Sequence, residues 1–471
     1  MIRSFKLKLK ILLVKPLVKY PLKNEDVGIP LGLMYLSSYI KRFSKDIEVS
    51  LLDCRLNKLL GRKRDIEREL SEFDVVATSA CTSEFYDACN ILREAKNQGK
   101  ITVMGGLFPT FNSEFALKTG CIDFVVRGEG ETTFLELLES IQGKKKIENV
   151  KGISFKAGNK IIHNPCREPI KNLNELPLPD YDVIQTKKYL KYCTGAIYSS
   201  RGCTNNCVFC SLNKFWDFKC RARSIKNVVK EIELLKSLGF ERIHFKDESL
   251  TLNQERARKL FSEIRKRNLN LNFKAKSRVD GLDQKLLKVM VGAGVDTVSF
   301  GVESVWGNSL KRMLKGSKVN KKAIEKCFHT LLSEDCNANP SFILGWLGET
   351  RESLEFNKEF IERWGSMEGV ITYLGFITPH PGLGLYEHAR KIGLKIISRD
   401  FNRYTHLLPV AFPESMGSNG LEEMTKVFNE ISVNTNTQEI NPLIREDYLS
   451  ELIEVKRVVP WKLKSKQNAM T

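Results

Sequence analysis

Short apolar runs alternate with amphipathic stretches along the first 142 residues. The runs are rich in β-branched residues and apolar on both faces, as buried parallel strands are; they are Ile11–Val14, Val49–Leu52, Val75–Thr78, Ile101–Met104 and Phe124–Val126. The intervening stretches carry apolar residues at helical spacing; they are Leu31–Arg42, Arg62–Glu72, Glu84–Asn97, Ser113–Lys118 and Thr132–Ile141. The alternation predicts an α/β fold with a doubly wound, Rossmann-like (flavodoxin-like) domain over residues 1–142.

The loops that follow these strands are rich in glycine and small hydroxyl residues. In an open α/β sheet the ligand binds beyond the carboxyl ends of the strands, and small residues let a large ligand approach the backbone. The candidates are Gly32, Thr78, Ser79, Gly105, Gly106, Pro109, Thr110, Gly128, Glu129, Gly130 and Glu131. Because any flavodoxin-like domain has glycines at its strand ends, this pattern predicts the place of a ligand without identifying it.

Residues 143–192 interrupt the alternation. The segment Gly152–His163, around Gly158-Asn159, predicts a β-hairpin, and Leu173–Tyr181 contains two prolines that predict a stiff linker. These features separate the first domain from a second one.

The alternation resumes over residues 193–400. Strand-like runs occur at Ala196–Ser199, Arg242–Lys246, Leu271–Lys276, Thr297–Gly301, Pro340–Leu344 and Ile371–Ile377. Six strand–helix units predict a partial (β/α)6 barrel of TIM type, with site residues at the carboxyl ends of its strands. Residues 401–471 are expected to form a small cap with a helix at Leu421–Ile431, followed by a polar, disordered tail after Lys462.

Composition narrows the class of protein. The chain has 471 residues and no apolar run of membrane-spanning length. Its 12 cysteines, with no recognisable secretion signal, favour reduced thiols and metal binding in the cytoplasm over disulfides. The formal net charge of +19 is spread along helices beside glutamates, as in Lys226–Lys236, so a nucleic acid partner is given low weight.

Cys203, Cys207 and Cys210 form the most informative motif of the chain. Their C-x3-C-x2-C spacing, on a loop just after a predicted strand, suits three irons of a 4Fe–4S cluster and leaves the fourth iron open for a ligand. An open iron can chelate S-adenosylmethionine (SAM) and reduce it to a 5′-deoxyadenosyl radical. The alternative is that Cys220 completes a four-thiolate zinc site, which would make the chain a zinc-stabilised basic RNA-binding module. Zinc sites more often show paired CxxC knuckles, and no second knuckle is present.

The run Ser200-Arg201-Gly202-Cys203 to Cys210, with an aromatic residue at Phe209, resembles the radical SAM superfamily. Over roughly residues 10–400 the chain is similar to the branch with an N-terminal cobalamin-binding domain. The resemblance implies a 4Fe–4S cluster on the three cysteines, SAM, cobalamin in the glycine-rich loops, and an external electron donor such as flavodoxin or ferredoxin.

The resemblance also implies residues for the two ligand sites. The expected SAM-binding residues are Phe209, Asp247, Glu248, Arg278, Gly301, Glu303 and Gly345. Of these, Glu303 is favoured most, because Gly301–Ser304 and the run Leu310–Gly316 after it are characteristic of the branch. His380 and Tyr386, on the segment after the sixth strand, are weaker candidates for contacting the substrate.

One departure from the family pattern concerns the protein ligand to the cobalt of cobalamin. Many cobalamin proteins supply a histidine ligand through Asp-x-His-x-x-Gly, but here the run is Asp53-Cys54-Arg55-Leu56-Asn57-Lys58. Either cobalamin binds without a protein histidine, as in many radical relatives, or the domain has lost it; we expect binding.

The expected activity is methylation of an unactivated carbon by a cobalamin-dependent radical SAM methyltransferase. The first alternative is a radical oxidoreductase or cyclase of the same branch without net methyl transfer. The second alternative is transfer of a methylthio group. The substrate, whether a small molecule, a lipid or a peptide, is not specified by the sequence.

Overall fold

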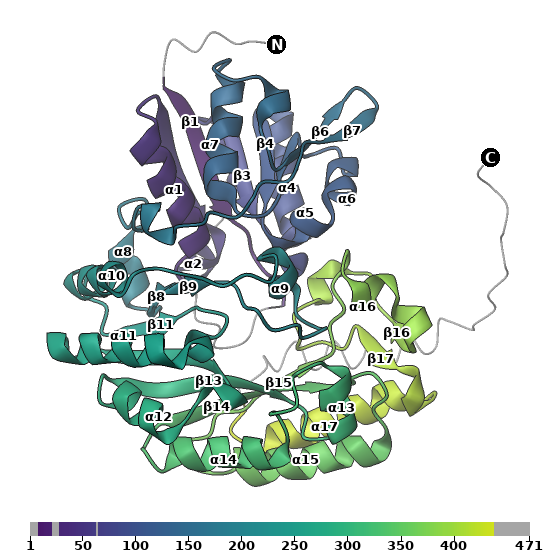
Figure 1. The fold of residues 1–471 in the computed structure, drawn as a ribbon. Helices are drawn as coiled ribbons and strands as arrows, with labels where there is room; N and C mark the ends of the chain where they lie inside the picture. Colours follow the sequence, from purple (N-terminus) through teal and green to yellow (C-terminus); the bar gives the residue numbers. More distant parts are fainter. Residues whose placement is uncertain (1–7, 21–27, 63–64, 438–471) are drawn as a thin grey trace.

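The computed structural model describes residues 8–20, 28–62 and 65–437. Two α/β units lie one above the other, with a C-terminal cap beside the lower unit (Figure 1). The tail predicted after Lys462 falls outside the described residues. Among the described residues, no helix combines the length and the apolar character needed to cross a bilayer.

The N-terminal unit is a seven-stranded sheet of order β2-β1-β3-β4-β5-β6-β7. Its parallel strands are β1 (Leu9–Lys15), β2 (Ile47–Asp53), β3 (Val75–Ser79), β4 (Ile101–Gly105) and β5 (Phe124–Val126). The helices of this unit are α1 (Leu31–Phe43), α2 (Cys54–Leu59), α3 (Ile66–Leu70), α4 (Phe85–Asn97), α5 (Leu107–Phe111), α6 (Ser113–Lys118) and α7 (Gly130–Ile141). All five predicted strands are present, which confirms the doubly wound fold.

The structure adds one detail to the sequence prediction and changes another. The hairpin formed by β6 (Ile153–Ala157) and β7 (Lys160–His163) pairs antiparallel with β5 and extends the sheet at its edge. In place of the helix expected over Arg62–Glu72, the described residues contain the shorter α3, because the Asp65 carboxylate accepts from the backbone N–H of Arg68 and caps the helix there.

The second unit is a six-stranded sheet of order β15-β14-β13-β12-β11-β8 in which every pairing is parallel. Its strands are β8 (Gly195–Ile197), β11 (Arg242–Phe245), β12 (Asn272–Arg278), β13 (Val295–Glu303), β14 (Asn337–Leu344) and β15 (Tyr373–Phe376). The covering helices are α10 (Ile225–Ser237), α11 (Gln254–Arg267), α12 (Gln284–Val291), α14 (Lys321–Leu332) and α15 (Arg351–Gly365). Because β8 and β15 do not pair, the barrel is open, as expected for a partial (β/α)6 barrel.

The sequence explains how these helices attach to their sheet. In α10, Val228, Val229, Ile232 and Leu235 are buried on one stripe, and Gly239, with a φ of +97°, follows the helix. One apolar stripe of α10 therefore packs into the core.

Short elements connect and cap the two units. The helices are α8 (Thr186–Leu190), α9 (Ser211–Phe215), α13 (Gly307–Arg312), α16 (Gly384–Glu387) and α17 (Gly420–Asn434), and the strands are β9 (Ser200–Arg201), β10 (Arg221–Ala222), β16 (Leu394–Ile396) and β17 (Ala411–Pro413). The 3₁₀ turns are η1 (Thr82–Glu84), η2 (Ile147–Asn149), η3 (Leu173–Glu175), η4 (Leu250–Leu252), η5 (Val279–Gly281), η6 (Ala389–Ile392), η7 (Phe401–Arg403) and η8 (Glu414–Met416).

The cap also contacts the N-terminal unit. Phe401 stacks on Tyr86 with ring centroids 5.5 Å apart and lies 5.2 Å from the ring of Phe108. Phe401, Tyr404 and Val410 belong to the same apolar core as Phe85. One hydrophobic cluster therefore links the last described part of the chain to the first domain.

Candidate active site at the facing edges of the two sheets

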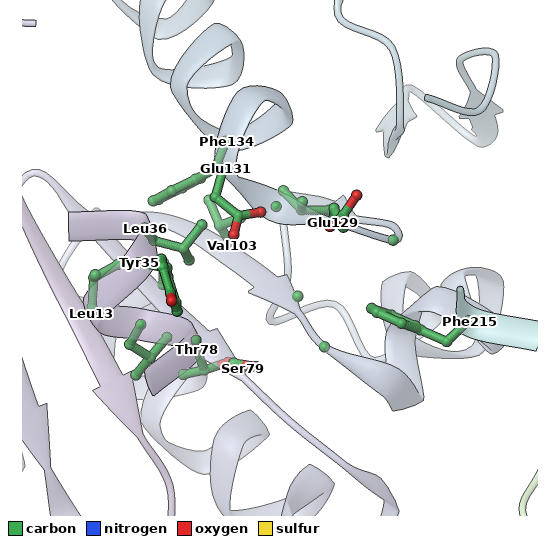
Figure 2. A pocket seen from close by; sticks show the side chains of 18 of the residues that line it. Leu13, Tyr35, Leu36, Thr78, Ser79, Val103, Glu129, Glu131, Phe134 and Phe215 are labelled. Carbon is green, nitrogen blue, oxygen red and sulfur yellow. The ribbon is translucent and has the colours of Figure 1, made fainter. Parts of the chain in front are cut away.

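A cavity of about 210 Å³ lies at the carboxyl ends of β1, β3, β4 and β5 (Figure 2). Of the eleven residues predicted to bind a ligand there, nine line it, namely Gly32, Thr78, Ser79, Gly105, Gly106, Gly128, Glu129, Gly130 and Glu131. The other two lie nearby in α5. Thr110 accepts a hydrogen bond from Gly128 N at 3.0 Å and donates to Gly106 O at 2.7 Å, and Pro109 is buried. The strand-end rule therefore located the cavity from sequence.

The glycines leave room for a large ligand. A methyl group added at Gly32 or Gly128 would meet no atom within 4 Å. At Gly106, where φ is +101°, a Cβ would lie 2.7 Å from Ala80 O, so this turn needs glycine for close backbone packing. The open glycine positions and the apolar residues beside them suit a bulky organic cofactor such as cobalamin.

The other wall of the cavity comes from the second unit. Tyr198, Arg201, Phe215 and Trp216 line it, and Figure 2 shows Phe215 across from Tyr35 and Leu36 of α1. The cavity is thus completed by residues that directly precede and follow the three-cysteine loop.

The loop with Cys203, Cys207 and Cys210 connects β9 to α9. All three thiols are free. Cys203 Sγ accepts from Asn205 Nδ2 at 3.1 Å, and Cys207 Sγ accepts from Arg278 Nη1 at 3.7 Å. These donors suit thiolate ligands of a 4Fe–4S cluster, the group that three cysteines at this spacing would hold.

Two effects act in opposite directions on the pKa of Cys207. Burial raises the pKa of the Cys207 thiol, while the nearby Lys315 and Arg278 cations lower it. Within the described residues, no three His, Cys, Asp or Glu side chains converge on one point as a zinc ion requires. A 4Fe–4S cluster makes a different demand, because each thiolate binds its own iron. Cys220, the proposed fourth zinc ligand, is exposed.

The two carboxylates predicted after β11 have protein partners. The Asp247 carboxylate accepts from Ser199 N, Ser199 Oγ and Ser200 Oγ at 3.0, 2.7 and 2.5 Å. Glu248 accepts from Gly202 N at 2.9 Å and from Trp216 Nε1 at 2.7 Å, and burial raises its pKa. Both therefore hold the backbone around the cysteine loop, and their expected contact with SAM stays a prediction.

The polar residues predicted at the ends of β12 and β13 meet beside Cys207. Glu303, whose φ is +65°, pairs with Lys315 at 3.1 Å, and Lys315 Nζ also donates to Gly301 O at 2.7 Å. Arg278 pairs with Asp280 at 2.9 Å and donates to the carbonyl of Lys315. A non-glycine residue with a positive φ is uncommon and gathers at functional sites, so this edge is a strained, charge-compensated candidate site for a zwitterion such as SAM.

Phe209 lies beside Trp346, the residue that follows Gly345. The Phe209 ring is 5.9 Å from the ring of Trp346, which is fully buried, and Lys315 Nζ lies 5.9 Å from the Phe209 centroid. Gly345, with a φ of +80°, donates its N–H to the Glu349 carboxylate. Burial raises the pKa of Glu349 to about 7.

A second cavity, of about 370 Å³, lies between the N-terminal unit, α9, the segment after β15 and the cap. His380, His406 and Tyr404 line it together with Thr82, and Thr82 Oγ1 lies 3.0 Å from His380 Nδ1. Burial lowers the pKa of His380 to about 3, which keeps the imidazole neutral. Tyr386, the other weak substrate candidate, is absent from this lining and packs against the core that contains Phe401.

Sequence reasoning missed several lining residues. Arg201 and Trp216 lie within or just after the cysteine motif, whose spacing points to its thiols and not to the residues around them. Lys315, at the barrel edge, lies in the Leu310–Gly316 run beside the exposed Leu314, and nothing in that run indicates that this lysine is the buried one. Tyr35 gave no signal, because an aromatic residue on a helix stripe is ordinarily core.

Comparison with known proteins identifies both units of the chain. The family model described as the radical SAM superfamily matches residues 197–361, and that described as the B12 binding domain matches residues 22–138. An uncharacterised methyltransferase of Pyrococcus horikoshii, PH0819, is 34% identical over 414 residues, covering 85% of this chain and 87% of the relative. An anaerobic magnesium-protoporphyrin IX monomethyl ester cyclase of Rubrivivax gelatinosus is 30% identical, covering 82% and 70%.

Solved structures share the fold. The radical SAM methyltransferase TsrM of Kitasatospora setae, with cobalamin and a 4Fe–4S cluster bound, aligns with a TM-score of 0.71 at 16% identity, covering 86% of this chain and 83% of that one. The cobalamin-dependent radical enzyme OxsB aligns with a TM-score of 0.70 at 19% identity, covering 96% and 71%.

The cofactors follow from the two family models and from the fit of the residues. The cysteine loop and strand ends of the second unit would hold the 4Fe–4S cluster and SAM, and the glycine-lined cavity would hold cobalamin. The chain therefore belongs to the radical SAM superfamily, in the branch that carries an N-terminal B12-binding domain.

Proposed function

We propose that this enzyme methylates an unactivated carbon of its substrate. When bound, the cluster with SAM supplies a hydrogen-abstracting 5′-deoxyadenosyl radical, and cobalamin supplies the methyl group. In the net reaction one substrate C–H, two SAM and two electrons give one C–CH₃, S-adenosylhomocysteine, methionine and 5′-deoxyadenosine. The electrons come from an external donor such as flavodoxin or ferredoxin, and reduced thiols fit a cytoplasmic location.

The observation that carries this proposal is that one wall serves two cofactor sites. Arg201 and Trp216 line the glycine-rich cavity, while Gly202 and Cys203 begin the cluster loop immediately after Arg201. A methyl carrier and a radical source held on the two sides of one short segment suit a reaction that needs both on the same substrate.

The chain's own residues have assigned tasks in this proposal. Arg278 is expected to bind the SAM carboxylate bidentately, and the carboxylate of Glu303 to accept hydrogen bonds from the SAM ammonium group. Asp247 and Glu248 keep the backbone around the cluster loop in place through the hydrogen bonds given above. The neutral imidazole of His380 would contact the substrate in the second cavity without adding a charge.

A second candidate is an oxidative cyclase without net methyl transfer. It is favoured by the Rubrivivax relative at 30% identity and by another cyclase of that name, from Cereibacter sphaeroides, at 29%. In this case cobalamin would not deliver a methyl group to product, and S-adenosylhomocysteine would not accumulate.

Product analysis separates the two candidates. The protein is reconstituted anaerobically with iron and sulfide and given SAM and a reductant, with and without hydroxocobalamin, while mass spectrometry follows the nucleosides. Formation of 5′-deoxyadenosine together with cobalamin-dependent S-adenosylhomocysteine supports the methyltransferase. Deoxyadenosine alone supports the cyclase. Neither product from a protein that holds a full cluster would contradict both, and Cys207→Ala provides the blank.

A further inference from the structure

Arg201 is the residue at which the two cofactor sites meet. Its guanidinium donates from Nη1 to Glu129 Oε1 at 2.8 Å and from Nη2 to Glu131 Oε1 at 2.7 Å. It lies 5.0 Å from the ring centroid of Tyr35 and 5.9 Å from that of Trp216. All of these partners line the glycine-rich cavity, so the Arg201 side chain contacts α1, the start of α7 and the residue after α9.

The carboxylates are part of the cavity and not of a distant surface. Figure 2 shows Glu129 and Glu131 at the start of α7, on the edge that faces Phe215. Arg221 Nη1 also donates to Glu129 Oε2 at 2.8 Å. In the antiparallel β9–β10 ladder, Arg221 is the residue directly opposite Arg201. Two arginines thus compensate two buried glutamates, and Glu131 depends on Arg201 in this set.

On its other side, Arg201 continues directly into the cluster loop. Gly202 N donates to Glu248 at 2.9 Å, and the same carboxylate accepts from Trp216 Nε1 at 2.7 Å. A Cβ at Gly202, where φ is +93°, would lie 1.9 Å from Lys219 O, so the backbone there is held tightly. Cys203 is the next residue, and a shift of the Arg201 backbone therefore moves the first cluster ligand.

We propose that Arg201 is a positioning residue that couples cobalamin binding to the placement of the cluster loop. A ligand that fills the cavity presses on the wall that Arg201 ties together, and this orders Gly202 and Cys203. Binding coupling is reciprocal, so cluster assembly strengthens cobalamin binding by the same factor. The inference rests on the two family cofactors and not on the net reaction.

The test measures the dissociation constant of hydroxocobalamin for two forms of the protein, with the cluster assembled and with iron removed. Wild-type protein is expected to bind at least fivefold more tightly when the cluster is present, within the usual range of coupling between two sites. Arg201→Lys keeps the charge but loses the planar fork that bridges two carboxylates. For this variant, the ratio of the two dissociation constants, iron-free over cluster-containing, is expected to fall below twofold. Loss of iron to a chelator, with and without hydroxocobalamin, should show the same pattern.

Two further variants separate coupling from folding. Glu131→Gln removes one anchor while leaving the Arg201–Glu129 pair, and it should also lower the ratio below twofold. Arg167→Lys is the matched control, because Arg167 forms an ion pair with Glu136 of α7 and is absent from the cavity lining. Its ratio should equal that of wild type. A role limited to folding would weaken both binding constants together and leave the ratio unchanged.

An unchanged ratio in Arg201→Lys and Glu131→Gln, or a ratio of one in wild type, overturns the coupling. Failure of wild-type protein to bind hydroxocobalamin at all would overturn the cofactor assignment and the coupling with it. Either result is distinguishable from failure of the methyltransferase proposal, which is decided by the nucleoside products.

Discussion

The two sheets of this protein present opposite kinds of edge to their cofactors. The N-terminal sheet offers space: at Gly32 and Gly128 an added methyl group would touch nothing. The partial barrel offers charges that already have partners, such as the buried Lys315–Glu303 pair and the Arg278–Asp280 pair. A cavity of the first kind exists before its ligand arrives, whereas a polar edge of the second kind has to exchange protein partners for ligand atoms.

This difference sets how each site responds to substitution. A cavity made by missing side chains is damaged by adding atoms, with little effect on folding. An edge of mutually paired charges is damaged by removing atoms, because the charge left behind is buried. The predictions below test that contrast, beginning with the largest effect.

The cluster loop is expected to give an all-or-none result. Cys207→Ala should abolish the iron–sulfur absorbance and the formation of 5′-deoxyadenosine, because three thiolates are the fewest that hold the cluster in this motif. Cys220→Ser, at an exposed cysteine, should leave both unchanged. Iron and sulfide analysis of both variants measures this, and loss of iron in Cys220→Ser would contradict the ligand assignment.

Removing one partner of the buried ion pair should strongly destabilise the fold. Lys315 is 4% exposed, so Lys315→Met leaves the Glu303 carboxylate buried without its cation. The expected loss in free energy of unfolding is about 3–5 kcal/mol. Lys259→Met, which breaks an exposed pair with Glu255, is the control and should leave the free energy of unfolding nearly unchanged. Urea titration of the iron-free proteins measures both.

Glu349, after β14, should make the stability of the fold depend on pH. Its pKa is about 7 in the fold, against an ordinary value of 4.5, so the native state holds a proton that the unfolded state releases. Stability is therefore full below about pH 4.5 and falls as the pH rises through 7, by roughly 3 kcal/mol. Glu349→Gln should remove this contribution. Urea midpoints at pH 5 and pH 8 that change equally in variant and wild type would show that Glu349 is not responsible.

The N-terminal cavity should lose binding without losing stability. Gly32 lies in the first turn of α1 and faces open space in the cavity, so Gly32→Leu fills part of it. Hydroxocobalamin binding is expected to weaken about tenfold, or about 1.4 kcal/mol, while the helix gains stability from loss of a flexible glycine. Gly307→Leu, at an equally open position in α13 outside the cavity, serves as the control. A parallel loss of stability and binding in Gly32→Leu would contradict the contrast between the two edges.

Sequence reasoning reached different depths in the two regions. The strand-end rule found nine residues of the N-terminal cavity, since parallel strands place their following loops along one edge. It did not find Trp216 or Arg201, because they reach the cavity through packing between units far apart in the chain, and it did not find Tyr35, because an aromatic residue on a helix stripe is ordinarily core. At the barrel edge, Glu303 and Arg278 were expected singly, but their partners Lys315 and Asp280 could not be assigned until the turns after β12 and β13 were known.

The cap is synthesised long after the first domain that it covers, and this delay matters during translation. Thr82 contacts His380, which lies 298 residues later, and the Phe85–Phe108 face of the first domain is covered by Phe401 from the cap. At translation speeds of about 5–20 residues per second, that aromatic face waits roughly 15–60 seconds for its cover. A nascent chain of this protein therefore carries an exposed apolar surface for most of its synthesis, and ribosome-bound chains stopped before residue 401 should engage holding chaperones that the finished protein does not.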